Sequence, residues 1–492
     1  MQAHSTTLGL EDKPSPGVIS DQLRAQLHAF LAPLVVELDA QIDLRLVRTL
    51  LRTVEAILSF RHRNHGLLLS ELGAFLLSPA HAPAGTKRLS QLLRCPKWSA
   101  ARLTRFLWRH AQARVEELRR TEGDALLLWD ESVLEKPESA QSEGLGAVRS
   151  SKAARLTRIK PGFYRPPGRP IHVPGRSWLC LLVIGQVGPP VVATMRWWSN
   201  RTRGRISRKI PTQIRRAVLR FCAWLWGPDV LHIWDRGYAG SPWLGEAFRY
   251  RVRFVQRWPK GWKLGEAPET LRPAWQWVRG KRAWEHQYLR DPRQQLRKVS
   301  VLAVPVRHPD YPEQPLWLVV GRSKGRPEPW YLLTNEPVTT AADAWRIVRA
   351  YARRWQMEMS FRYSKSELAF ESPRLWTWER RLKLLLLATL AYAFLLTLLR
   401  EAWETLRVWL LRQFCHRTGK RARETPSPLY RLRTALGRLW LAYPAAPPGP
   451  AQNPGDSCCF SIPDAGYGAA GFQASCLPLK PAQGWYAAAL ES

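Results

Sequence analysis

The sequence predicts an α/β protein in which an all-α region precedes the core and a β-rich insertion interrupts it. Three patterns support this prediction. Apolar residues recur at intervals of three and four between residues 21 and 120, which is typical of helices. Two short apolar runs, 124–130 and 230–235, each end in Trp-Asp and are separated by a helical pattern, as expected for buried strands in an α/β sheet. Short alternating segments from 259 to 335 are typical of half-buried strands.

These patterns divide the chain into six predicted segments. They are a flexible lead-in (1–20), a helical DNA-binding region (21–121), the first part of the core (122–258), the β-rich insertion (259–337), the second part of the core with C-terminal helices (338–440), and a disordered tail rich in Pro, Gly and Ala (441–492).

The charge of the chain predicts a polyanionic partner. Its 492 residues include 75 Lys and Arg against 39 Asp and Glu, a net charge of +36 that is spread along the whole chain. Such an excess favours nucleic acid. The seven cysteines show no CxxC spacing, so neither a zinc site nor a disulfide framework is indicated. The N-terminus has no charged-then-apolar signal pattern, and we expect a cytoplasmic protein.

Two basic helical patterns flank the turn Cys95-Pro96-Lys97-Trp98 in the N-terminal region. A short basic helix, a turn and a longer basic helix are compatible with a DNA-reading module. Helix pairs of this kind also occur in ordinary bundles, and the sequence leaves both interpretations open.

Asp130 and Asp235 stand at the predicted carboxyl ends of the two apolar runs. Ligands and chemistry in open α/β sheets lie beyond these strand ends, so the two carboxylates are candidate site residues. The alternative is that each aspartate caps a helix or forms a turn. Their matching sequence context favours the first interpretation.

The stretch from Tyr351 to Lys365 is predicted to be one helix with a functional face. At roughly 100° per residue, Tyr351, Arg354, Glu358 and Lys365 fall in one narrow stripe, which Arg362 borders. A carboxylate among cations and a phenol is suited to a metal ion that meets a phosphate backbone. A solvated face with i,i+4 charge pairs is the alternative.

An apolar run from Lys383 to Leu399 follows this stretch. It is shorter than the ~20 residues that a bilayer requires and is bounded by basic residues. We therefore predict a buried helix and no membrane partner.

The order strand-Asp130, strand-Asp235, helix-Glu358 resembles the acid triad of DDE transposases, whose catalytic core is RNase H-like. A β-insertion before the glutamate adds to the resemblance. Two spacings are similar to the bacterial insertion-sequence-four family of these enzymes: Tyr351-x2-Arg354-x3-Glu358-x6-Lys365 and Asp235-Arg236-Gly237-Tyr238.

The resemblance implies a DNA transposase that performs metal-dependent strand cleavage and strand transfer. Asp130 would bridge two Mg²⁺ ions, with Mn²⁺ as an alternative, and Asp235 and Glu358 would each hold one. The DNA-binding residues that it implies are Tyr351, Arg354, Arg362, Lys365, Arg236 and Tyr238.

The implied partners are double-stranded DNA, namely the inverted repeats of the protein's own element and a target site, and a second subunit in the complex with the DNA ends. We expect association with the nucleoid. Excision would pass through a hairpin intermediate, and a flipped base would stack on one aromatic residue of the insertion. The candidates for that residue are Trp258, Trp262, Trp275, Trp277, Trp284, Trp317 and Trp330.

Two alternatives remain. A DDE-type nuclease or integrase would share the acids but lack one step. A catalytically silent DNA-binding protein or regulator derived from a transposase would share the fold and charge.

Overall fold

The fold was analysed in a computed structural model of the chain. The residues that it describes are 15–59, 66–121, 123–136, 142–152, 170–202, 205–206, 209–290, 295–323, 328–415 and 429–445. The predicted tail beyond 445 and the first 14 residues of the predicted lead-in lie outside these ranges.

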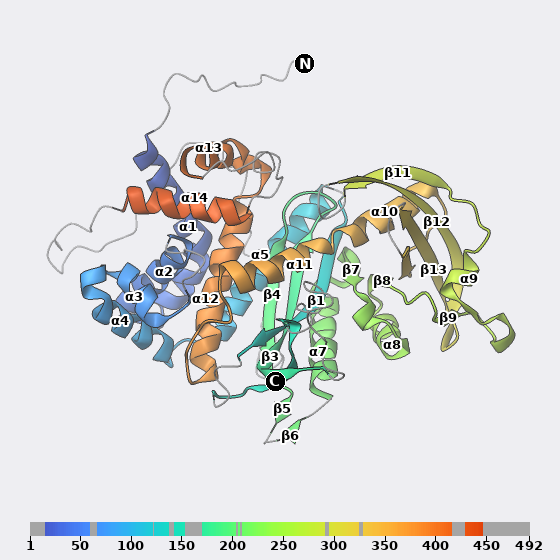
Figure 1. Ribbon diagram of the computed structural model, residues 1–492, viewed down its shortest axis with the longest axis horizontal. Helices are drawn as coiled ribbons and strands as arrows, with labels where there is room; N and C mark the ends of the chain where they lie inside the picture. The colour runs from blue at the N-terminus through green and yellow to red at the C-terminus, as the bar shows by residue number, and fades with distance from the viewer. Residues whose placement is uncertain are drawn as a thin grey trace, which may run out of the picture.

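The N-terminal region is helical, as predicted, and lies at the left of Figure 1. Its elements are α1 (Pro16–Asp39), α2 (Leu44–Ser59), α3 (Leu69–Leu76), the 3-10 turn η1 (Pro79–His81), α4 (Ala82–Arg94) and α5 (Ala100–Arg120). Ser15 caps α1 and Pro16 occupies its first turn, where a missing N–H has no cost. The prediction of a flexible lead-in to residue 20 is therefore wrong from Pro16 onward, since Ile19 already lies in the hydrophobic core.

Helix α5 belongs to the packing of the core as much as to the N-terminal region. It packs against the sheet and against α12 (Trp378–Thr397). Its basic residues Arg102, Arg105 and Arg109 pair with Glu37 of α1. The helix pair that the sequence predicts is present as α4 and α5, but contact of this region with DNA stays a prediction.

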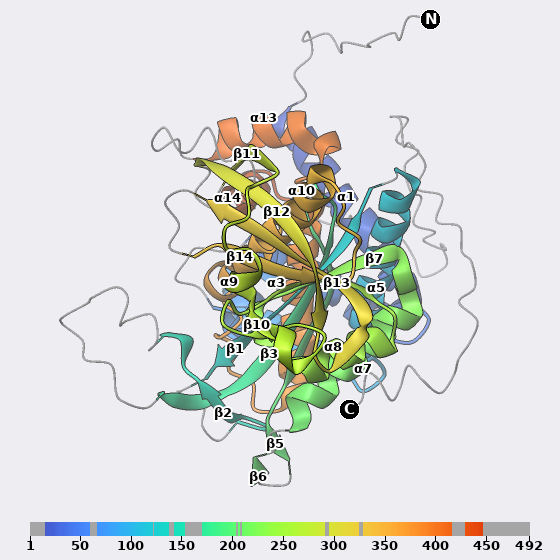
Figure 2. The same cartoon turned by 90° about the vertical axis from the view of Figure 1, so that its right-hand side faces the viewer.

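A mixed sheet of ten strands forms the centre of the described part of the molecule (Figures 1 and 2). Its order is β11-β12-β13-β14-β8-β7-β1-β3-β2, and β4 also pairs with β3. The strands are β1 (Ala125–Glu135), β2 (Gly146–Arg149), β3 (His172–Ile184), β4 (Val191–Trp198), β7 (Val230–Trp234), β8 (Arg253–Arg257), β11 (Glu285–Arg290), β12 (Leu296–His308), β13 (Tyr311–Ser323) and β14 (Trp330–Thr334). Two small ladders pair β5 (Arg201–Thr202) with β6 (Arg205–Ile206) and β9 (Lys263–Leu264) with β10 (Arg272–Pro273).

Helices cover both faces of the sheet, so its central strands are apolar on both sides. In β1, Leu126 and Leu128 join one core cluster, while Leu127 and Trp129 join the other. The remaining helical elements are α7 (Lys209–Trp226), η3 (Gly227–Asp229), η4 (Arg236–Tyr238), α8 (Ser241–Arg249), η5 (Pro268–Thr270), α9 (Ala274–Trp277), α10 (Ala341–Ala352), α11 (Trp355–Arg362), η6 (Tyr363–Glu367), η7 (Glu401–Trp403), α13 (Glu404–Phe414) and α14 (Leu429–Ala442). The predicted mixed α/β class with a helical N-terminal region is confirmed.

The β-rich segment predicted at 259–337 extends the core sheet. Strand β14 pairs antiparallel with β8, in the register Leu332 to Arg257, and β13, β12 and β11 follow outward. Figure 2 shows these strands as one continuous twisted surface with the core. Strand pairing therefore joins the β-rich insertion directly to the core sheet.

The strand that holds Asp130 continues beyond it. We predicted that the strand ends at this aspartate, but β1 runs on to Glu135 because its pairing with β3 continues to the pair Glu135–Gly175. Asp130 thus lies in mid-strand, whereas Asp235 directly follows the end of β7, as predicted.

The apolar run after residue 383 is helix α12, which is buried in the fold from Leu384 to Leu396. This confirms the predicted buried helix. Within the described residues no single helix is long and apolar enough to cross a membrane; α12 together with the segment Glu401–Phe414 meets those limits only as a pair bent by 84°.

Candidate active site

The two aspartates lie on neighbouring parallel strands. Strands β1 and β7 pair in the register Leu128 to Ile233, so Asp130 and Asp235, two residues further along each strand, come out at the same end of the sheet. Glu358 reaches the same place from α11, which contacts β1.

The three carboxylates converge on one guanidinium, and we name Asp130, Asp235, Glu358 and Arg354 the acid cluster. Arg354 Nη1 donates to Asp130 Oδ2 at 2.9 Å and pairs with Asp235 Oδ2 at 3.9 Å, while its Nη2 donates to Glu358 Oε1 at 2.6 Å. The two aspartate oxygens are therefore separated by no more than the sum of 2.9 and 3.9 Å. The predicted convergence of the acids is found, and a cation of the protein itself lies at its centre.

Burial makes this cluster electrostatically costly. Removal from water raises the pKa of Asp130 to about 7, Arg354 opposes that rise, and the nearby charge of Asp235 adds to it. Burial disfavours the charged form of Arg354, but the surrounding acidic groups hold the pKa of its guanidinium above the ordinary value. Three carboxylates with one cation leave an excess of negative charge, which favours binding of further cations.

The predicted single helix from Tyr351 to Lys365 is wrong. Helix α10 ends at Ala352, a turn at Arg353 and Arg354 follows, α11 ends at Arg362, and η6 continues as a π-helix. The turn contains i→i+3 bonds such as Met357 N to Arg354 O, which tighten the chain and place Arg354 over the acids. Arg354 and Glu358 still pair at i,i+4, whereas Tyr351 lies in α10 and Lys365 in the π-helix beyond α11.

Tyr351 is buried, and its ring packs edge-on against Trp330 with the ring centroids 5.2 Å apart. Burial raises the pKa of its phenol, against the effect of Arg354 and Arg257. Arg362 is exposed on the outer side of α11. Of the predicted DNA-binding residues on this stretch, only Arg354 contacts the acids.

Lys365 lies in a separate polar cluster on η6. Burial lowers the pKa of its ammonium, while Glu371 and Glu135 oppose the effect. Within the described residues its ammonium forms no hydrogen bond and no short ion pair, whereas Glu371 pairs with Lys152 at 2.7 Å. A partly buried lysine without a close counter-ion is suited to an incoming anion.

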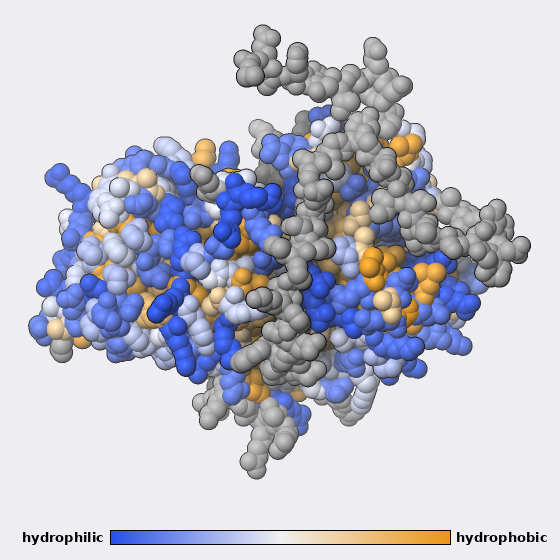
Figure 3. Space-filling model, turned by 180° about the vertical axis from the view of Figure 1, so that it is seen from behind, coloured by the Kyte–Doolittle hydropathy of each residue, from blue (hydrophilic) through white to orange (hydrophobic). Residues whose placement is uncertain are grey.

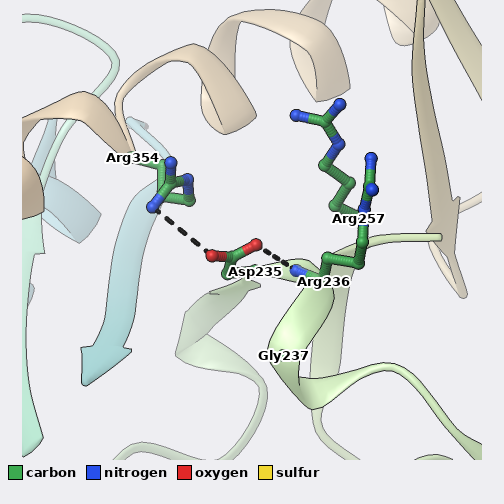
Figure 4. Close-up of a pocket in the computed structure, with 5 residues that line it drawn as sticks. All are labelled: Asp235, Arg236, Gly237, Arg257 and Arg354. Atoms are coloured by element: carbon green, nitrogen blue, oxygen red, sulfur yellow. Dashed lines mark hydrogen bonds and ion pairs between the residues drawn. The ribbon is translucent and has the colours of Figure 1, made fainter. Parts of the chain in front are cut away.

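A pocket of about 520 Å³ lies beside the acid cluster and is lined by Asp235, Arg236, Gly237, Arg257 and Arg354 (Figure 4). One oxygen of Glu328 pairs with both Arg236 at 2.8 Å and Arg257 at 3.4 Å. We name Arg236, Arg257 and Glu328 the arginine cluster. The excess of guanidinium groups makes the pocket suitable for a phosphate.

Tyr238 lies in the turn that follows Asp235. Its ring is buried, and its hydroxyl donates to Glu131 Oε1 at 3.1 Å. Glu131 also accepts from Arg215 of α7, with Nη2 to Oε2 at 2.7 Å. In the structure Tyr238 thus fixes the turn after Asp235 against β1, and contact of Tyr238 with DNA stays a prediction.

Sequence reasoning missed Glu131, Arg215, Arg257 and Glu328. The Asp-Glu pair in one predicted strand, Asp130-Glu131, could have indicated the first. Nothing in the sequence marks the others, because Arg257 and Glu328 come together through the pairing of β8 with β14.

The candidate tryptophans differ in their access to the pocket. Trp258 is buried, which leaves no face for a base. Trp262 is 46 % exposed and lies against Gly240, in the turn that follows η4. Trp330 contacts Tyr351. Trp275 and Trp284 are exposed, and Trp277 and Trp317 are partly buried.

The acid cluster fits divalent metal ions by its donor atoms. Carboxylate oxygens are the ligands that Mg²⁺ and Mn²⁺ prefer. In the described residues, however, no group of three or more His, Cys, Asp or Glu side chains is arranged as a metal site. Arg354 lies among the three carboxylates, where its guanidinium is the cation that they share.

Comparison with known families agrees with this geometry. Residues 212–394 match the family model described as Transposase DDE domain. The matched segment contains Asp235 and Glu358, and Asp130 precedes it. The match supports a DDE transposase, and with it a DNA substrate and a role in recombination. No curated protein matches the chain.

Proposed function

We propose that this protein is a DDE transposase of the insertion-sequence-four type, with an RNase H-like core, that cleaves and transfers DNA strands at the inverted repeats of its own insertion sequence. The observation that supports this most strongly is the convergence of Asp130, Asp235 and Glu358 beside a pocket rich in arginine. These acids are far apart in sequence. Bringing three carboxylates together costs free energy, so the requirements of packing do not explain their convergence.

In this proposal the three carboxylates hold two Mg²⁺ or Mn²⁺ ions. Such a pair of ions supplies an activated nucleophile and neutralises charge on the attacking and leaving oxygens of the phosphodiester. Without the metal ions, Arg354 offsets part of the negative charge of the three carboxylates. When the carboxylates hold the ions, the guanidinium of Arg354 would pair with DNA phosphates.

The cations around the acid cluster bind the DNA backbone. Arg236 and Arg257 lie in the pocket, and Lys365 offers an unpaired ammonium further along the same segment. Arg362 adds an exposed charge, and Tyr351 shapes the pocket wall against Trp330. We assign the stacking of a flipped base to Trp262, which lies against Gly240, or to Trp330, which packs on Tyr351.

The larger assembly follows from the chemistry. Two element ends must be cut and joined to one target, so we propose a dimer on the paired ends, with a hairpin intermediate during excision. The excess of basic residues supports binding along double-stranded DNA, and we place the protein with the nucleoid in the cytoplasm.

Cleavage of end DNA by Asp130→Asn tests the proposal. The variant loses a carboxylate ligand but keeps the basic charge, so end-DNA binding should persist while Mg²⁺-dependent cleavage falls by at least about a hundredfold, or ~2.7 kcal/mol. Asp39→Asn, on the exposed end of α1, makes the same chemical change away from the site and should cleave normally. Cleavage by Asp130→Asn at the wild-type rate would exclude the assigned triad.

A catalytically silent DNA-binding protein is the second candidate. The position of Arg354 among the acids favours it, since the guanidinium occupies the space between the carboxylates in which a metal ion would be held. A wild-type protein that binds end DNA and never cleaves it in Mg²⁺ or Mn²⁺ would support this candidate. Cleavage without strand transfer would instead indicate a DDE-type nuclease.

A further inference from the structure

Glu328 lies between two arginines that line the pocket. Its Oε2 is 2.8 Å from Arg236 Nη2 and 3.4 Å from Arg257 Nη2. The hydrogen bond from Arg236 is the main reason that the pKa of this carboxyl lies below its ordinary value, and the charge of Arg257 acts in the same direction. The carboxylate is therefore ionised and shared by both guanidiniums.

The three residues come from different parts of the fold. Arg236 follows the end of β7, Arg257 is the last residue of β8, and Glu328 stands two residues before β14. Because β14 pairs with β8, the approach of Glu328 to Arg257 is a consequence of the sheet. The β-rich insertion thus supplies an anion to a cationic pocket of the core.

One oxygen shared by two guanidiniums is also the arrangement that a phosphate oxygen takes between two arginines. The same pocket is lined by Asp235 and Arg354 of the acid cluster, so an anion there lies next to the proposed reaction centre (Figure 4). We propose that Arg236 and Arg257 form a subsite for a DNA phosphate and that Glu328 occupies this subsite until DNA displaces it. This inference rests on the proposed function for the identity of the phosphate as that of DNA.

The exposure of the cluster makes the exchange feasible. The side chains of Arg236 and Glu328 are 46 % and 30 % exposed, and that of Arg257 is 21 % exposed. Ion pairs with this much access to water contribute little to stability. A phosphodiester can therefore replace the carboxylate, and the pairs with Glu328 lower the affinity for DNA only moderately.

The test compares two substitutions that each remove one negative charge from the insertion. Glu328→Gln frees the pocket arginines. Glu266→Gln removes the partner of Arg307, which pairs with it at 3.1 Å and lies outside the pocket. Binding of a short fluorescent duplex with the element's end sequence is measured by anisotropy in a chelator, over a series of salt concentrations.

We expect Glu328→Gln to bind about three- to tenfold more tightly than wild type at low salt, and Glu266→Gln to change less than about twofold. The gain should shrink as salt rises, because phosphate contacts release counter-ions. Equal effects of the two variants, or no gain for Glu328→Gln, would overturn the proposal.

Glu328→Asp keeps the carboxylate and guards against a folding defect. It should bind like wild type, whereas a gain equal to that of Glu328→Gln would contradict displacement of a charge. Because the assay needs no cleavage, its outcome is independent of whether the protein cuts DNA. If the protein never cleaves DNA but Glu328→Gln binds it more tightly, the phosphate subsite is supported and the proposed catalytic function is not. If the protein cleaves DNA but Glu328→Gln shows no gain in affinity, the proposed function stands and the subsite is excluded.

Discussion

In the acid cluster three carboxylates share the guanidinium of Arg354, whereas in the arginine cluster two guanidiniums share the carboxylate of Glu328. The two clusters are neighbours and meet at the pocket that contains Asp235 and Arg354. The acid cluster lacks two positive counter-charges and the arginine cluster lacks one negative counter-charge, so the missing charges have opposite signs. The arginine cluster is therefore complementary to a negative phosphodiester, and the acid cluster to the cations that accompany it.

The pair Asp130 and Arg354 has less access to water than the rest of the two clusters. These two side chains are each 17 % exposed, whereas those of Asp235 and Glu358 are 37 % and 41 % exposed, and that of Arg236 is 46 % exposed. Uncompensated charge is costly where water is excluded and cheap where it is not. Changes to Asp130 or Arg354 should therefore alter stability and chemistry, and changes in the arginine cluster should alter mainly the binding of DNA.

The largest stability effect is expected for Arg354→Gln. Without the guanidinium the three carboxylates repel one another, and unfolding in a chelator should become easier by about 2–3 kcal/mol. Divalent ions should then stabilise the variant more than wild type, because they no longer compete with Arg354. Thermal unfolding in EDTA and in a Mn²⁺ titration measures both effects.

Arg362→Gln is the matched control, since it lies on the same segment, is exposed and carries the same charge. A loss of stability equal to that of Arg354→Gln would show that any arginine of this segment stabilises the fold, and that pairing with the three carboxylates is not the cause. If Mn²⁺ raised the melting temperature of Arg354→Gln no more than that of wild type, competition between Arg354 and the metal ions for the carboxylates would be excluded.

The pH dependence of stability gives a second comparison. Burial raises the pKa of Asp130 from its ordinary value of 3.8 to about 7, so between these values the unfolded chain is ionised while the folded protein holds the proton. The contribution of Asp130 to stability is thus fully present below about pH 4 and is lost as the pH rises through about 7.

Denaturant unfolding of wild type and Asp130→Asn at pH 5 and pH 8, in a chelator, tests this. We expect the free energy of unfolding of the variant, minus that of wild type, to be larger at pH 8 than at pH 5. Parallel profiles would mean that Asp130 stays ionised throughout and that Arg354 fully compensates it.

Lys365→Ala tests whether cations outside both clusters serve the phosphates. We expect excision of a donor element to fall by at least about tenfold, or ~1.4 kcal/mol, with normal folding. Lys383 is unsuitable as the comparison, because it is buried, pairs with Glu379 and donates to the carbonyl of Cys95. Lys281→Ala, at an exposed lysine, is the control, and equal activity of both variants would return Lys365 to a structural role.

The smallest effect is expected for Tyr238→Phe, which removes one hydrogen bond to Glu131. The turn that this bond fixes contains both Asp235 and Arg236, so one change reaches both clusters. We expect stability to fall by about 1 kcal/mol and cleavage and DNA affinity to decline together. Loss of cleavage with full DNA affinity would mean that the turn positions Asp235 alone.

The sequence by itself determined the class of fold and the identity of the acids. Apolar period and strand length suffice for the helical N-terminal region and for β1, β7, β8 and α12, because burial on one or two faces leaves a pattern in the chain. Asp130 and Asp235 stand out because a charge next to an apolar run is visible locally, and Glu358 stands out by its spacing from Tyr351, Arg354 and Lys365.

Only the tertiary structure decided how these side chains are paired. The break at Arg353 and Arg354, the burial of Tyr238 and the contact of Glu328 with Arg257 depend on which strands lie side by side. A helical period assumes an unbroken helix, and it does not show that two aspartates from separate strands pair with the guanidinium of Arg354 beside its i,i+4 partner Glu358. Electrostatic pairing in a partly buried site acts through space, and so it leaves no period in the sequence.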